Sequence, residues 1–278
     1  MLQSILLLQT SKLPPVVTKM ITSRQNSKIK HISQLSSQGK ARKKEGLYVV
    51  EGIRILEEAH KAGRYPNQVL YTSELDQRGW GLLKVFQDRN IPCEEAAPEV
   101  FKAASDTETP QGILAVFPID PAPVPEKLNL VLIADKIRDP GNLGTLVRSC
   151  LAAEADLLIL SPGSVDPYSP KVIRAGMGAH FRLPVIKTDY AEISRITAGL
   201  TLFLADMNEG KSLWETDLGG RVGLIIGSEA HGPGKSARGL ASNTIHIPMN
   251  PASESLNAAV SGAVLLFEVL RQRNLLNK

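Results

Sequence analysis

The sequence predicts an α/β protein with two domains, a smaller amino-terminal one and a larger carboxy-terminal one built on a parallel sheet. Three observations predict this fold class. Short strand and helix patterns alternate between residues 21 and 117. Four prolines lie within residues 118–125, and such a segment cannot continue a helix or a central strand. From residue 128 the expected strands are apolar almost throughout, which is typical of a parallel sheet covered on both faces by helices.

The smaller domain is expected to span residues 21–117 and to be followed by a proline-rich linker, residues 118–127. Its pattern predicts strands at 47–50, 69–71 and 113–117, the last entered through a turn at 109–112, and helices through 53–59 and 82–88. Residues 1–20 are expected to form a disordered extension, and Met20 is an alternative natural start.

The larger domain is expected to span residues 128–278. Its predicted strands are 130–133, 157–160, 202–204, 222–226 and 244–247. The last segment, 255–273, predicts a helix that is apolar around most of its circumference and therefore needs burial on more than one side. Packing against a second subunit would supply that burial, so a homodimer is expected.

Composition limits the class of protein. Of 278 residues 43% are hydrophobic and 22% charged, as in ordinary globular proteins. The two cysteines, Cys93 and Cys150, suggest no disulfide framework, which favours a reducing cytoplasm. No apolar run is long enough to span a bilayer, and the five histidines lack the spacing of metal ligands, so neither a membrane nor a metal is expected.

The net charge of +4 is unevenly distributed. From Lys19 to Lys44 there are eight lysines and arginines and no acidic residue. Such a run can neutralise the phosphates of a nucleic acid, although a solvated helix and loop would have the same composition. The residues considered for such contacts are Arg24, Lys28, Lys30, Arg42, Lys43 and Lys44.

Three polar or glycine-rich segments follow predicted strands, where α/β folds assemble ligand sites. The first is Asp-Pro-Gly-Asn-Leu-Gly-Thr-Leu-Val-Arg, residues 139–148. Asn142 is suited to cap the helix that follows. Arg148 lies off the apolar stripe of that helix, so it is either an ordinary surface arginine or a guanidinium directed at a phosphate or a developing alkoxide.

The second segment is Gly-Ser-Glu-Ala-His-Gly, residues 227–232, directly after the apolar strand 222–226. Its glycines would let a ligand approach the backbone closely. The spacing is neither the dinucleotide fingerprint nor a phosphate loop. A hydrolase triad of Ser228, Glu229 and His231 is disfavoured because sequence neighbours rarely form one.

The third segment holds Ile247-Pro248-Met249 and Ser255-Leu256-Asn257. Ser253 or Ser255 could cap the last helix. Asn257 is an isolated amide in the first turn of an apolar helix, and it is either a structural clasp or part of a site.

Together the three segments resemble the motifs of the SpoU (TrmH-like) RNA ribose 2′-O-methyltransferases. Segments of the smaller domain, residues 21–30, 48–52 and 109–112, also resemble the ribosomal-protein-L30-like substrate-binding domain of that family. The resemblance covers roughly residues 21–273. It implies a carboxy-terminal domain with a deep trefoil knot in which S-adenosylmethionine is bound.

The resemblance also implies roles for individual residues. The cofactor would be held at Gly227, Ile247, Leu256, Met249 and Ser255, and the catalytic set would be Arg148, Asn142, Glu229 and Asn257. We interpret Arg148 as an electrostatic stabiliser rather than a base, because arginine normally stays charged. Glu229 would orient Arg148 or Asn142.

The implied function is methylation of a ribose 2′-hydroxyl in structured RNA, with 23S ribosomal RNA preferred because the chain has a separate substrate-binding domain. Two alternatives share the fold: a transfer-RNA 2′-O-methyltransferase, and a non-catalytic RNA-binding or ribosome-assembly protein. An unrelated nucleotide-dependent α/β enzyme is disfavoured, since both phosphate-binding fingerprints are absent from the sequence.

Overall fold

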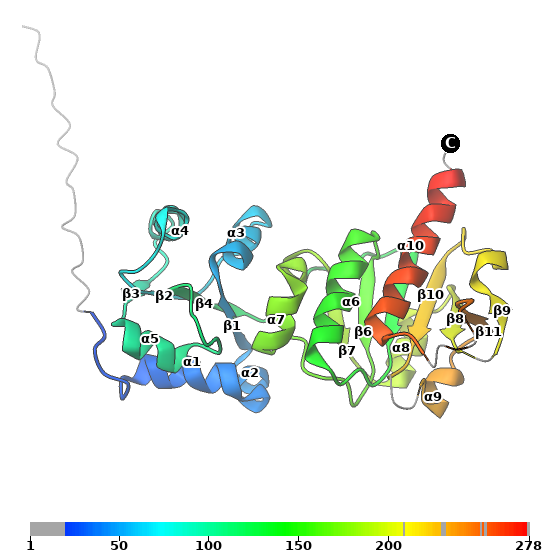
Figure 1. The fold of residues 1–278 in the computed structure, drawn as a ribbon, viewed down its shortest axis with the longest axis horizontal. Helices are drawn as coiled ribbons and strands as arrows, with labels where there is room; N and C mark the ends of the chain where they lie inside the picture. Colours follow the sequence, from blue (N-terminus) through cyan, green and yellow to red (C-terminus); the bar gives the residue numbers. More distant parts are fainter. Residues whose placement is uncertain (1–19, 208, 229–231, 251, 253–254, 277–278) are drawn as a thin grey trace, which may run out of the picture.

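The computed structural model describes residues 20–207, 209–228, 232–250, 252 and 255–276. It contains two sheets joined by the proline-rich segment (Figure 1). Apart from Pro118, which ends a strand, residues 118–127 contain no helix or strand. Both expected α/β units are therefore present in the described chain, and the parallel sheet of the larger one is confirmed.

The smaller sheet has four strands in the order β1-β4-β2-β3, with β4 antiparallel to both neighbours and β2 parallel to β3. Helices α1, α2 and α5 cover one face, and α3 and α4 cover the other (Figure 1). The strands are β1 Leu47–Glu51, β2 Gln68–Tyr71, β3 Cys93–Glu95 and β4 Ile113–Pro118. The helices are α1 Ser27–Ser37, α2 Gly39–Glu45, α3 Ile53–Lys61, α4 Gln77–Gln87 and α5 Pro98–Ala104.

The larger sheet has seven strands in the order β7-β6-β5-β10-β8-β11-β9, and every pairing in it is parallel. Its strands are β5 Leu130–Ala134, β6 Leu157–Leu160, β7 Val185–Lys187, β8 Thr201–Ala205, β9 Lys211–Ser212, β10 Val222–Ile226 and β11 Asn243–His246. Its helices are α6 Pro140–Ala152, α7 Pro170–Gly176, α8 Tyr190–Ile196, α9 Lys235–Arg238 and α10 Ala258–Leu276, with 3₁₀ turns η1 Ala179–Phe181 and η2 Leu213–Glu215.

Two hydrophobic cores enclose this sheet. Alternate residues of the central strands β5 and β10 point to opposite faces, where α6, α7 and α10 cover one side and α8 and α9 the other. The strands are therefore buried throughout, as their uninterrupted apolar sequences predict. The expected knot stays a prediction, because strand order and pairing do not by themselves trace one.

Helix α6 begins differently from the prediction. Asp139, not Asn142, is its cap: the Asp139 carboxylate accepts a hydrogen bond from the Asn142 backbone N–H at 2.8 Å, and Pro140 fills the first helical position. The expected apolar stripe is confirmed, since Leu143, Leu146, Val147 and Cys150 are buried.

Helix α10 also begins later than expected. Its first residue is Ala258, and Asn257 caps it by accepting hydrogen bonds from the N–H groups of Ala259 (2.9 Å) and Val260 (3.2 Å). The prediction of Ser255 as cap is wrong because Asn257 already satisfies the free N–H groups. Asn257 is also exposed rather than a buried amide. The alternative cap, Ser253, lies outside the described residues.

The two units contact each other directly through α7, which lies beside β1 (Figure 1), and through η1, which contacts α3. Ile173 and Phe181 of the larger unit pack into the core between α3, α4 and the small sheet. Ion pairs cross the same boundary between Arg42 and Asp166 (2.7 Å), Arg174 and Asp106 (2.9 Å), and Arg182 and Glu58 (3.0 Å).

Candidate functional site: a pocket at the carboxyl edge of the parallel sheet

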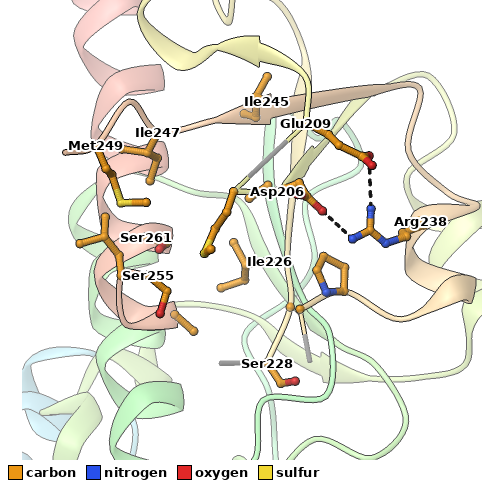
Figure 2. Close-up of a pocket in the computed structure, with 17 residues that line it drawn as sticks. Asp206, Glu209, Ile226, Ser228, Arg238, Ile245, Ile247, Met249, Ser255 and Ser261 are labelled. Atoms are coloured by element: carbon orange, nitrogen blue, oxygen red, sulfur yellow. Dashed lines mark hydrogen bonds and ion pairs between the residues drawn. The ribbon is translucent and has the colours of Figure 1, made fainter. Parts of the chain in front are cut away.

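Strands β8, β10 and β11 end at one edge of the larger sheet, and a cavity of about 490 Å³ opens there (Figure 2). Because parallel strands share a direction, the segments that follow them meet at this edge. Its lining residues are Ala205, Asp206, Met207, Glu209, Ile226, Gly227, Ser228, Gly232, Pro233, Arg238, Ile245, Ile247, Met249, Ser255, Leu256, Ala258 and Ser261.

The five residues predicted to hold the cofactor all line this cavity. Gly227 leaves β10, Ile247 and Met249 follow β11, and Ser255 and Leu256 precede α10. Ser255 and Ser261 approach the cavity from the side of α10, opposite Asp206 (Figure 2). Gly227 and Leu256, which lie 29 positions apart in the chain, therefore line one pocket.

Gly227 has a geometric requirement that the sequence only suggested. A Cβ atom at this position would lie 2.1 Å from the Pro233 backbone nitrogen and 2.2 Å from the Gly232 carbonyl carbon. The chain returns this close because Gly232 donates a backbone hydrogen bond to the Ser228 carbonyl at 2.9 Å. Both neighbours are backbone atoms, so no side-chain rotation would make room for a larger residue.

A charged wall of the pocket was missed in the sequence analysis. Arg238 of α9 forms an ion pair with Asp206, which follows β8, and lies 3.8 Å from a carboxylate oxygen of Glu209 (Figure 2). The side chain of Asp206 is 10% exposed. A signal existed: the Asp206 carboxylate lies two residues after the predicted strand 202–204, at the strand end where ligand-binding residues gather.

A buried carboxylate anchors the far end of the loop after β10. Asp135 is fully buried and accepts hydrogen bonds from the Ser161 hydroxyl (2.6 Å), the Tyr190 hydroxyl (2.7 Å) and the Gly234 backbone N–H (2.9 Å). Burial, together with the hydrogen bond to Asp135, raises the pKa of Tyr190. The network ties Gly234 to the residues that follow strands β5 and β6.

The proposed catalytic residues are brought together only in part. The Asn257 amide donates a hydrogen bond to the Asn142 side-chain oxygen at 2.9 Å, across 115 residues of sequence. This contact joins the first and third sequence segments at the start of α6 and α10. Glu229 and His231 lie outside the described residues.

Arg148 is further along α6, six residues after Asn142, which corresponds to about 9 Å along the helix axis. Its side chain is exposed, and it makes no hydrogen bond or ion pair with the part of the chain that the structure describes. The apolar stripe of α6 does not include it. Arg148 therefore does not contribute to the packing of helix α6.

The basic segment divides into two groups. Arg24, Lys28, Lys30, Lys43 and Lys44 are exposed, and Lys28 pairs with Glu94. Arg42 instead is 5% exposed: its guanidinium contacts Asp166 and the carbonyls of Leu35 and Ser36. RNA contact by Arg42 is at odds with this packing, because its donors already hold the two units together.

The described residues also bear on metal binding and on insertion into a membrane. They contain no group of three or more histidine, cysteine, aspartate or glutamate side chains placed to hold a metal ion. Within the same residues, no helix has both the length and the apolarity required to cross a membrane.

Comparison with known proteins agrees with this arrangement. Residues 129–267 match the SpoU rRNA Methylase family, and residues 26–115 match the MRM3-like substrate binding domain. The mouse mitochondrial rRNA methyltransferase 3 is 32% identical, over 83% of this chain and 69% of the relative. The 23S rRNA (guanosine(2553)-2′-O)-methyltransferase RlmP of Bacillus subtilis is 29% identical, over 90% of this chain and 99% of its own length.

A solved structure has the same fold over nearly the whole chain. The SpoU methyltransferase AviRb from Streptomyces viridochromogenes, in complex with the cofactor AdoMet, superposes with a TM-score of 0.80 at 28% identity, covering 90% of this chain and 99% of AviRb. The fold, the pocket lined by the second and third motif segments, the contact of the first segment with Asn257 and the family match lead to the same conclusion. This chain belongs to the SpoU rRNA methylase family.

Proposed function

We propose that this protein transfers the methyl group of S-adenosylmethionine to a ribose 2′-hydroxyl of ribosomal RNA. The observation that carries the proposal is the pocket formed by the second and third motif segments, joined to the first by the hydrogen bond between Asn257 and Asn142, in a chain of the SpoU family. The named activities of RlmP and of mitochondrial rRNA methyltransferase 3 support ribosomal RNA as the substrate class. The complex of AviRb with AdoMet supports the cofactor.

The pocket fits the chemistry of this cofactor. Its volume of about 490 Å³ lies within the range of small-molecule sites. Ile226, Ile247 and Leu256 offer an apolar wall for an adenine ring, and Asp206 and Glu209 place carboxylates where ribose hydroxyls or an ammonium group can bind. Gly227 allows a ligand to contact the backbone. S-adenosylmethionine supplies an electrophilic methyl group on a sulfonium.

The protein's contribution is to orient the ribose and to favour loss of the 2′-hydroxyl proton. The hydrogen-bonded Asn142 and Asn257 amides form a rigid polar pair that can position the ribose. The Arg148 guanidinium stabilises the forming alkoxide electrostatically. Glu229 is proposed to orient Arg148 or Asn142.

The smaller unit, residues 21–117, is proposed to bind the RNA, and residues 128–278 to carry out methyl transfer. Exposed Arg24, Lys28, Lys30, Lys43 and Lys44 supply phosphate contacts of the kind that weaken with added salt. Arg42 is omitted from this surface because it is buried in the contact between the units.

We further propose that the protein is a cytoplasmic homodimer joined through its larger unit. Helix α10 is covered on one side only: Leu265, Leu266 and Val269 are buried, whereas Val260 is 47% and Phe267 47% exposed. A second subunit would cover these side chains. Light scattering after size exclusion should give twice the chain mass of 30.1 kDa; a monomer at micromolar concentration contradicts the dimer.

The test is transfer of tritiated methyl groups from S-adenosylmethionine to total RNA, and to ribosomal particles, from a strain lacking the protein. We expect label in ribosomal RNA that nucleoside analysis recovers as a 2′-O-methylnucleoside. Label in transfer RNA alone would show that transfer RNA, not ribosomal RNA, is the substrate. Binding of RNA without methyl transfer in any preparation would favour the non-catalytic RNA-binding alternative.

A further inference from the structure

A second cavity, of about 190 Å³, lies where the two units meet. The smaller unit contributes Tyr48 of β1, Phe117 and Pro118 of β4, and the segment Gly63, Arg64 and Tyr65 after α3, while Asp120 belongs to the connecting segment. The larger unit contributes Tyr168, His180 and Phe181. None of these residues lines the pocket at the sheet edge, so the cavity is a separate feature.

Aromatic rings concentrate in this small space. The sequence contains 6 Phe, 2 Trp and 5 Tyr, and five of these residues line the cavity: Tyr48, Tyr65, Phe117, Tyr168 and Phe181. Neighbouring rings lie with centroids 5.0 Å apart for Tyr48 and Tyr168, and 5.2 Å apart for Phe117 and Phe181. Such walls favour a flat, unsaturated ligand over an aliphatic one.

Two polar groups face this cavity without partners. Tyr48 is 4% exposed and Tyr168 is half-buried, yet neither hydroxyl makes a hydrogen bond with any described residue. Neither hydroxyl oxygen is among the buried polar atoms that lack a partner, so both can be reached from the cavity. The two hydroxyls therefore offer hydrogen bonds to a molecule inside the cavity.

The charges of the cavity select against an ionic ligand. Burial lowers the pKa of His180 to about 4, and the Pro167 carbonyl offsets only part of that effect, so the ring at the cavity wall is neutral near pH 7. Arg64 is neutralised by Asp120, with nitrogen and oxygen 2.7 Å apart. Gly63, Pro118 and Asp120 are exposed, which leaves the cavity open to solvent on their side.

We infer that this cavity binds a single unstacked nucleobase of the RNA substrate. A nucleobase is flat, uncharged and carries hydrogen-bond donors and acceptors on its edge, which matches the aromatic walls, the two free hydroxyls and the balanced charges. RNA-binding proteins commonly stack splayed-out bases on aromatic side chains and read their edges by hydrogen bonds. The inference rests on the proposed function, because that function supplies RNA as the partner.

The test removes only the hydroxyls. The variants Tyr48→Phe, Tyr168→Phe and the double variant keep the rings and their packing, and Tyr71→Phe, on β2 and outside the cavity, is the matched control. The probes are the four nucleoside monophosphates, ribose 5-phosphate and single-stranded RNA. Binding is followed by the NMR signals of ¹³C-labelled tyrosine rings and by fluorescence titration of the RNA.

We expect RNA or nucleotides to shift the signals of Tyr48 and Tyr168 but not that of Tyr71. Each single variant should weaken binding about three- to tenfold, without lower thermal stability and without a change in S-adenosylmethionine affinity. Shifts with nucleoside monophosphates would show that a free base suffices, whereas shifts with RNA alone would show that the strand must present it; either supports the site.

Equal binding by the double variant and Tyr71→Phe, or equal shifts with ribose 5-phosphate, would overturn the inference. The two proposals fail separately. If nucleotides shift the tyrosine signals of the wild-type protein but it methylates no RNA, only the proposed function is contradicted. If the double variant methylates RNA fully and binds it with unchanged affinity, only the base site is contradicted.

Discussion

Replacing Gly227 by alanine should damage the proposed cofactor pocket while leaving most of the fold intact. The added Cβ would lie 2.1 Å from the Pro233 nitrogen, and real contacts of this kind essentially never fall below 3.0 Å. The backbone of Gly232 and Pro233, which lines the pocket, must therefore move by about 1 Å. Overpacking of this kind costs about 1–3 kcal/mol, equivalent to a loss of affinity of about 5- to 150-fold if it falls on the cofactor site.

The measurement is isothermal titration calorimetry with S-adenosylmethionine, alongside thermal unfolding. Gly220→Ala is the matched control, because a Cβ there would meet nothing within 4 Å. We expect Gly220→Ala to bind the cofactor as wild type does and Gly227→Ala to bind it at least fivefold more weakly. If Gly227→Ala stays folded and binds within twofold of wild type, the assignment of this pocket to the cofactor is refuted.

Three further outcomes follow from the site and the boundary between the units. Asn257→Ala should lower the free energy of unfolding by about 1 kcal/mol, because it removes the cap of α10. Asn257→Asp keeps the cap but loses the N–H donor to Asn142, so it should lose turnover without losing stability. Wild-type turnover in Asn257→Asp would contradict the role of the amide. Arg148→Ala should abolish methyl transfer and change cofactor affinity less than twofold, since Arg148 does not line the pocket; retained activity would refute its assignment. The pKa of His180 falls from 6.5 to about 4 on folding because burial disfavours the charged ring. The folded state therefore resists protonation of His180. The contribution of the neutral ring to the free energy of unfolding is complete above about pH 6.5. It is lost as the pH falls toward 4, a decrease of about 3 kcal/mol. Denaturant titrations between pH 6.5 and pH 4 should show that the free energy of unfolding decreases in wild type and decreases less in His180→Phe. Equal pH dependence in the two proteins would contradict the role of His180.

The sequence was most informative where the local pattern and the tertiary environment agree. Strands such as Leu157–Leu160 and Val222–Ile226 were predicted with their observed bounds because they are apolar on both faces and buried on both. The short strands β3, β7 and β9 were missed. They have two or three residues each and carry polar side chains, so sheet pairing rather than local pattern defines them.

The proposed cofactor pocket could be anticipated from its motifs, but the ion pair in its polar wall could not. Gly227, Ile247 and Leu256 belong to segments with a recognisable order, whereas Asp206 and Arg238 meet only after α9 packs beside the end of β8. The same limit explains Arg42. Its basic neighbours suggested a solvated charge, and only the contact with Asp166, 124 residues later, buries it.

The most direct test of the central claim is a map of ribose methylation in ribosomal RNA from cells with and without this protein. Mass spectrometry of ribosomal RNA fragments should show at least one 2′-O-methyl group that is absent from the deletion strain. Wild type should restore it, and Arg148→Ala, expressed at the same level, should not. Identical methylation in the presence and absence of the protein would contradict the claim that it methylates ribosomal RNA.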